Sequence, residues 1–165
     1  MKGRLIALNH AVILWGSTLY VGVLWALHFF WFPSWQHLTV ANYYDQFIPQ
    51  TTAATRFFTF WVPITFLCLL VMLWSERHTR LRWVPWAGLL CLATSTSVGQ
   101  FLIIPINHYL ATHITDQAVL TERMTRWMFL NNIRWVTETL AWLVMMYYFV
   151  AKGDLPARIE QDLKP

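Results

Sequence analysis

Charged side chains are scarce in this sequence, at 12% of 165 residues against 57% hydrophobic residues. A soluble domain needs more charge than this to cover its surface. Cysteine is scarce too, and both cysteines, Cys68 and Cys91, fall inside long apolar runs, which disfavours a structural disulfide or a zinc site. Low-complexity segments and convincing internal repeats are missing. These absences exclude a water-soluble protein and leave an integral membrane protein as the expected class.

Long apolar runs are abundant, and they predict four membrane-spanning helices at about residues 11–31, 57–74, 83–104 and 127–150. Each run is close to the ~20 residues that a helix needs to cross a bilayer. Trp, Phe and Tyr gather near the ends of the runs, as in an aromatic belt at the membrane surface. We therefore predict an all-α, polytopic four-helix bundle that forms a single membrane domain over residues 1–165.

The segments between the predicted spans are short and more polar. Residues 33–55 mix polar and aromatic side chains, which predicts a loop on the membrane surface. Pro105 is expected to end the third span, and residues 107–126 to form a polar connection to the fourth. Within the third span a row of small residues recurs every four positions, which favours close approach of another helix: Ala87, Cys91, Ser95 and Gly99.

The basic residues indicate how the chain is oriented. The formal charge is +4, but no basic stripe exists, so we expect no nucleic-acid partner. With four crossings, one side would carry Lys2, Arg4, Arg77, Arg80, Arg82, Lys152, Arg158 and Lys164. The other side would carry only Arg56, Arg123 and Arg126. The positive-inside rule then predicts that both termini are cytoplasmic, in a bacterial inner (plasma) membrane.

Polar side chains inside the fourth span are the main candidates for chemistry, because such groups are costly in a bilayer and need a partner or a function. Asn131, Arg134 and Glu138 follow Trp127 at helical spacing and are expected on one face. Arg134 and Glu138 are also four residues apart, so they form either a catalytic pair or an ion pair that locks the bundle. Gln100 of the third span is expected at a similar depth.

Three histidines on the predicted outward side are candidate metal ligands. His28 is expected near the end of the first span, and His108 and His113 lie in the connection that follows the third. Imidazoles from several helices commonly hold haem, copper or iron in bundles. However, His108 and His113 are five residues apart rather than three or four, and the His-Glu motifs of di-iron bundles are missing. Solvated loop histidines are the alternative.

One stretch resembles a known family. Ile104-Pro105-Ile106-Asn107, followed after about twenty residues by Trp127 and then by Asn131 and Arg134, resembles a pattern in the anthrone oxygenase-like group of small four-helix membrane proteins. Much of that group is functionally unassigned, and named members oxidise polycyclic phenolic anthrones to quinones. The resemblance implies oxidation of a lipophilic phenolic substrate, and it does not cover Glu138 or the histidines. The alternative is an architectural motif, in which Asn107 and Asn131 cap and join the two helices through amide hydrogen bonds to Arg134.

Three functions remain open at this point. The favoured one is a membrane-embedded oxidoreductase or oxygenase-like protein that acts on a lipophilic phenolic or quinol-like substrate. Arg134, Glu138 and Asn131 would be catalytic, and Gln100, Asn107 and Trp127 would bind substrate. The second is a non-catalytic accessory subunit of a larger membrane complex, or a homo-oligomer. The third is a haem- or copper-binding electron carrier with histidine ligands.

Overall fold

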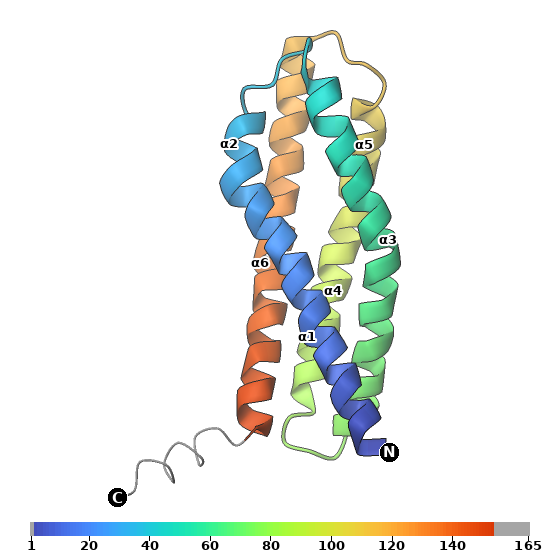
Figure 1. Cartoon of the computed structure of the whole chain (residues 1–165). Helices are drawn as coiled ribbons and strands as arrows, with labels where there is room; N and C mark the ends of the chain where they lie inside the picture. The colour runs from blue at the N-terminus through green and yellow to red at the C-terminus, as the bar shows by residue number, and fades with distance from the viewer. Residues whose placement is uncertain (1, 154–165) are drawn as a thin grey trace, which may run out of the picture.

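The computed structural model describes residues 2–153, which form four helical rods side by side (Figure 1). The first rod consists of α1 (Lys2–Ala26), the π-helix η1 (Leu27–Trp31) and α2 (Phe32–Trp35). The second rod is α3 (Tyr43–Glu76). The third consists of α4 (Trp83–Val98), the π-helix η2 (Gly99–Ile103) and α5 (Ile104–Leu110), and the fourth is α6 (Gln117–Lys152).

Three rods are long and apolar enough to cross a membrane: Gly3–Trp35, Tyr43–Glu76 and Trp83–Leu110. The fourth, α6, spans 36 residues and is the least apolar of the long helices, because it carries the charged residues Glu122, Arg123, Arg126, Arg134 and Glu138. It packs along α1 and α4 as an integral part of the bundle. The predicted fold class, an all-α polytopic membrane protein built as a helical bundle, is confirmed.

The rods are longer than the predicted spans, and the predicted surface loop at residues 33–55 is wrong. Most of that segment belongs to α3, which begins at Tyr43 and continues through Pro49. Tyr43, Phe47 and Thr51 are spaced by four residues and are buried on one face. Polar residues on the opposite face hid this amphipathic helix from a search for continuous apolar runs. The connection at 107–126 is likewise mostly helical, within α5 and α6.

Each of the two π-helices ends two residues before a proline, Pro33 or Pro105. The backbone N–H of Phe32 bonds to the carbonyl of Leu27, and that of Ile104 bonds to Gly99, five residues back in both cases. A proline ring clashes with the carbonyl four residues before it, and a wider turn relieves that clash. Pro105 therefore does not end the third rod as predicted, since the helix passes it and continues to Leu110.

The bundle has two ends. We call them the inner end and the outer end, as labels that follow the orientation predicted from the sequence. The inner end contains the start of α1 and the loop 77–82, and the outer end contains the loops 36–42 and 111–116 (Figure 1). Each end has its own apolar core, and Leu27 packs against both. Arg158 and Lys164, which entered the orientation prediction, lie outside the described residues.

Candidate functional site

A cavity of about 770 Å³ lies among the four rods, between the first rod and α3. Its walls are mostly aliphatic and aromatic, and both π-helices contribute to them. Five of the residues predicted as catalytic or substrate-binding line it together: Gln100, Asn107, Trp127, Asn131 and Arg134. The lining also includes the exposed side chains Trp31 and Phe57, so the cavity reaches the lipid-facing surface between η1 and α3.

Among the described residues, Arg134 is the only charged residue that lines the cavity, and its side chain has two hydrogen-bond partners. Its Nη1 donates to Asn131 Oδ1 at 2.9 Å, and its Nη2 donates to the Tyr20 hydroxyl at 2.6 Å. Its Nε is buried and has no hydrogen-bond partner among the described residues. The guanidinium is thus held in place from α6 and α1 while one donor stays unused, which suits it to a ligand oxygen.

The amide side chains around Arg134 are themselves oriented. Asn131 is 2% exposed, and its Nδ2 donates to the carbonyl of Trp127 at 3.0 Å, which turns its Oδ1 toward Arg134. Trp127 in turn donates from Nε1 to Asn107 Oδ1 at 2.7 Å and so ties α6 to α5. The polar wall is therefore pre-organised rather than a set of free side chains.

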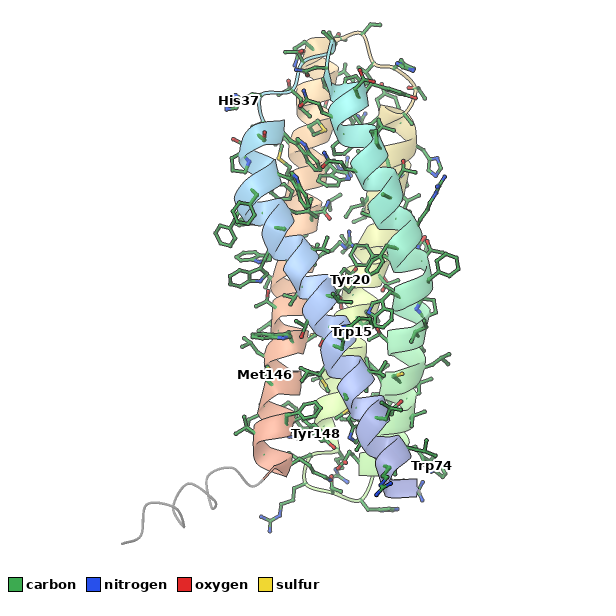
Figure 2. The ribbon with its side chains drawn as sticks, viewed as in Figure 1. Trp15, Tyr20, His37, Trp74, Met146 and Tyr148 are labelled. Carbon is green, nitrogen blue, oxygen red and sulfur yellow. The ribbon has the colours of Figure 1, made fainter. Side chains whose placement is uncertain are left out.

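The small residues Ser95 of α4 and Gly99 of η2 pack beside this arrangement, as their predicted role in helix packing implies. A Cβ placed on Gly99 would lie 3.9 Å from Nε and Cζ of Arg134. Ser95 is fully buried, and its hydroxyl lies 3.1 Å from that of Tyr20. Tyr20 was not predicted as a site residue, although a hydroxyl within an apolar run was the available signal; Figure 2 shows it midway along the bundle.

Glu138 lies outside the cavity wall and forms no ion pair with Arg134, so the predicted pairing along α6 is not seen. The reason is direction: Arg134 reaches across to Tyr20 on α1, whereas Glu138 faces α4 beside Ser95 and Cys91. Glu138 is 2% exposed, and its Oε1 has no hydrogen-bond partner within residues 2–153. A buried carboxyl with an open acceptor is costly unless it has a function or takes up a proton.

The three histidines predicted as metal ligands are not brought together. The ring of His28 stacks on Trp135 with centroids 4.3 Å apart. His108 is exposed on α5, and His113 is an exposed loop residue stacked on Tyr44 at 3.6 Å. None of them lines the cavity. The part of the chain that the structure describes contains no group of three or more His, Cys, Asp or Glu side chains suited to a metal ion.

A second polar cluster, at the inner end, was missed by the sequence reasoning. Glu76 lies in the polar segment that follows the second predicted span, yet it is buried at the end of α3. Its carboxylate accepts from Tyr148 Oη at 2.7 Å, from Thr79 Oγ1 at 2.7 Å and from Lys152 Nζ at 2.9 and 3.1 Å. Two of these partners, Tyr148 and Lys152, come from α6, so the local sequence around Glu76 does not identify them.

His10 belongs to the same inner cluster. Its Nδ1 lies 3.0 Å from Tyr148 Oη and its Nε2 lies 3.3 Å from Ser75 Oγ. Both ring nitrogens of His10 therefore have partners among the described residues. The cluster joins α1, α3 and α6, and Figure 2 shows Tyr148 at this end of the bundle.

No family model matches the chain, and neither the curated proteins nor the solved structures compared with it give a match. The resemblance to the anthrone oxygenase-like group stays a prediction carried by its own motif. The structure places the motif residues next to one another, with Trp127 bonded to Asn107 and Arg134 bonded to Asn131.

Proposed function

We propose that this protein is a membrane-embedded oxidoreductase that binds a lipophilic phenolic or quinol-like molecule in the cavity, with an oxygen of that molecule at Arg134. The observation that supports this most is the make-up of the cavity wall within residues 2–153, which is mostly aromatic and aliphatic and in which Arg134 is the single charged residue, bonded to the oriented amide of Asn131. The volume, about 770 Å³, also suits a molecule of a few fused rings, since ligand pockets are commonly ~300–1,000 Å³.

Arg134 has the chemistry to stabilise a phenolate or enolate. Its unused Nε–H is a buried donor on a charged group, and electrostatic interactions are stronger for buried groups than in bulk water. A ligand that is a weak acid in water becomes easier to deprotonate when its anion forms beside such a cation. Anthrones and quinols are acids of this kind, and their anions are far more easily oxidised than the neutral molecules.

A short relay is available for the proton. Because the Tyr20 oxygen accepts from Arg134, its own hydrogen is free to donate to Ser95, which lies beside Glu138. A proton that leaves the ligand for the Tyr20 oxygen displaces the Tyr20 hydrogen to Ser95, and the Ser95 hydrogen moves to Glu138. In this proposal Glu138 acts through Tyr20 and Ser95 rather than by touching the ligand.

The oxidant in the proposal is dioxygen, which dissolves well in lipid. For an anthrone, the methylene carbon loses two hydrogens and gains one oxygen atom as a carbonyl, while the second oxygen atom leaves with both hydrogens as water. One anthrone and one dioxygen thus give one anthraquinone and one water. The chain's own residues bind the anthrone, hold its anion and remove the first proton.

The test is aerobic conversion of an anthrone to its quinone by protein purified in detergent, followed by absorbance. Arg134→Gln is expected to lower kcat/KM by about 100-fold or more, the usual cost of removing one oxyanion partner. Arg126→Gln is the matched control, because Arg126 is an exposed arginine on the same helix outside the cavity. The proposal is refuted if wild-type protein forms quinone no faster than the spontaneous reaction. It is also refuted if the Arg134→Gln variant is fully active.

The proposal also places the protein in a bacterial plasma membrane, with both termini on the cytoplasmic side. The support is the distribution of basic residues: Arg4, Arg77, Arg80, Arg82 and Lys152 all lie at the inner end. Positive charge favours the cytoplasmic face. The cavity would then lie in the half of the bilayer away from the cytoplasm.

A further inference from the structure

A second hollow lies on the outside of the bundle at the inner end, between α3 and α4. It measures about 590 Å³ and shares no lining residue with the cavity around Arg134. We call it the inner groove; it is lined by Leu70, Leu73, Trp74, Arg77, Arg82, Trp83 and Trp86. Figure 2 shows Trp74 at this end of the molecule.

The inner groove carries positive charge that nothing in the described chain neutralises. Arg77 and Arg82 are both exposed, and neither forms an ion pair within residues 2–153. The Arg77 guanidinium is held over the Trp74 ring, with Cζ 3.8 Å from the ring centroid. The neighbouring carboxylate, Glu76, is buried and already bonded to Lys152, so it does not oppose an anion in the groove.

The rest of the groove is apolar and exposed. Trp74, Trp83 and Trp86 expose 71%, 45% and 62% of their surfaces, which indicates lipid rather than water around them. Leu70 lies seven residues before Arg77 on α3, so it is ~10 Å deeper along the bundle. The groove therefore changes along the bundle axis from cationic at the end, through a belt of tryptophans, to aliphatic further in.

We propose that the inner groove binds an anionic phospholipid of the leaflet on that side. The phosphodiester lies between Arg77 and Arg82, and one acyl chain follows Leu70, Leu73 and Trp86 into the bilayer. Basic pockets between membrane helices on the cytoplasmic side bind such head groups. A zwitterionic phosphatidylcholine brings a cation next to the arginines, and free phosphate gains nothing from the apolar part. This site is independent of the function proposed for the cavity.

Native mass spectrometry of the full chain in detergent, titrated with phosphatidylglycerol or phosphatidylcholine, tests the site. Wild-type protein is expected to bind phosphatidylglycerol in preference. The double variant Arg77→Gln/Arg82→Gln should bind it roughly thirtyfold more weakly, from ~1 kcal/mol for each basic residue near an anionic lipid. The matched control Arg56→Gln/Arg126→Gln loses two exposed arginines elsewhere and should bind like wild type. Equal binding of the two lipids, or equal loss in both double variants, overturns the proposal.

Two further measurements separate a lipid groove from a simple anion site. Trp86→Ala keeps both arginines and removes part of the apolar wall, so it should weaken phosphatidylglycerol binding severalfold. Millimolar inorganic phosphate should not displace the lipid. Unchanged lipid binding by Trp86→Ala, or displacement by phosphate, shows that only the head-group charge is recognised and overturns the groove. Unfolding temperatures measured without added lipid establish that each variant is folded.

Discussion

At the scale of single residues, two glycines of α1 have opposite surroundings. A Cβ on Gly16 would lie 2.6 Å from Nε1 of Trp61, whereas a Cβ on Gly22 would have no atom within 4 Å. Trp61 is also packed edge-on against Trp15 at 4.8 Å, so it has little freedom to move away. The close approach of α1 and α3 therefore depends on Gly16.

We expect Gly16→Ala to lower the free energy of unfolding by about 1–3 kcal/mol, the usual cost of overpacking. Gly22→Ala should be neutral or stabilising by up to about 1 kcal/mol, because alanine favours a helix over glycine. Reversible unfolding in mixed detergent micelles compares the two. Equal effects would contradict the close packing at Gly16.

The inner polar cluster makes a second prediction at this scale. Glu76→Ala removes a buried acceptor and leaves Tyr148 and Thr79 without their partner, so we expect a loss of about 2–4 kcal/mol. Lys152→Ala should cost about 1 kcal/mol or less, because the Lys152 side chain is 49% exposed and water can replace it at the carboxylate. The same unfolding assay applies, and a Lys152 effect as large as that of Glu76 would mean that the ion pair rather than burial controls the cluster.

Much of the cavity's polar wall could be predicted from the sequence because polar groups in apolar runs are rare. Arg134, Asn131 and Gln100 are conspicuous for that reason. Spacing along a helix does not settle which neighbour a long side chain reaches, so the Arg134–Glu138 pair was expected where the structure has Arg134 bonded to Tyr20. The inner polar cluster could not be predicted from the sequence, because it depends on contacts between α1, α3 and α6, which are far apart in the chain.

At the scale of helices, the first half of α3 is the largest departure from the prediction. Continuous apolarity is a good signal for a helix inside lipid, but beyond the lipid a helix needs only one apolar face. Phe47 is fully buried there and packs edge-on against Trp35 and Trp127, with ring centroids 5.0 Å apart in both cases. That contact joins α2, α3 and α6 above the cavity.

Phe47→Ala is therefore expected to destabilise the protein by about 3–5 kcal/mol, as for other large core aromatics. Gln46→Ala, at the exposed neighbouring position, should change stability by less than about 0.5 kcal/mol. Unfolding measurements in detergent decide between this packed helix and a surface loop, in which both substitutions would have small effects.

The π-helices show another limit of sequence reasoning about elements. A proline marks where a helix is disturbed, and Pro33 and Pro105 do mark both sites. A proline is expected to end a helix. Here both helices continue past the proline, because the wider π-helical turn before it relieves the steric clash and the following turns are packed in the bundle. Because both wide turns lie in the cavity wall, they shape the site.

At the scale of the whole molecule, α6 decides whether the termini share a side. Its polar residues lower its overall apolarity, yet Glu138 and Asn131 face the bundle interior and are shielded from lipid. We expect α6 to cross the membrane with α1 and α4, because it packs along both of them. Four crossings would then place the start of α1 and the end of α6 on the same side.

Reporter fusions test this topology. We expect a green fluorescent protein fused to the C-terminus to fluoresce, because it folds in the cytoplasm, and alkaline phosphatase inserted in the loop 111–116 to be active. Phosphatase inserted in the loop 77–82 is the control and should be inactive. If the fluorescent protein at the C-terminus does not fluoresce, and alkaline phosphatase fused at the C-terminus instead is active, then α6 does not cross the membrane.

The opening of the cavity between η1 and α3 has a consequence for any binding measurement. Trp31 and Phe57 are exposed on helices that are apolar enough to cross a membrane, so a hydrophobic ligand of the kind proposed would enter after partitioning into the lipid. The concentration that governs occupancy is then the number of ligand molecules per lipid, and adding empty vesicles dilutes it without changing the total. The half-saturating amount of ligand should accordingly rise in proportion to the lipid in the sample.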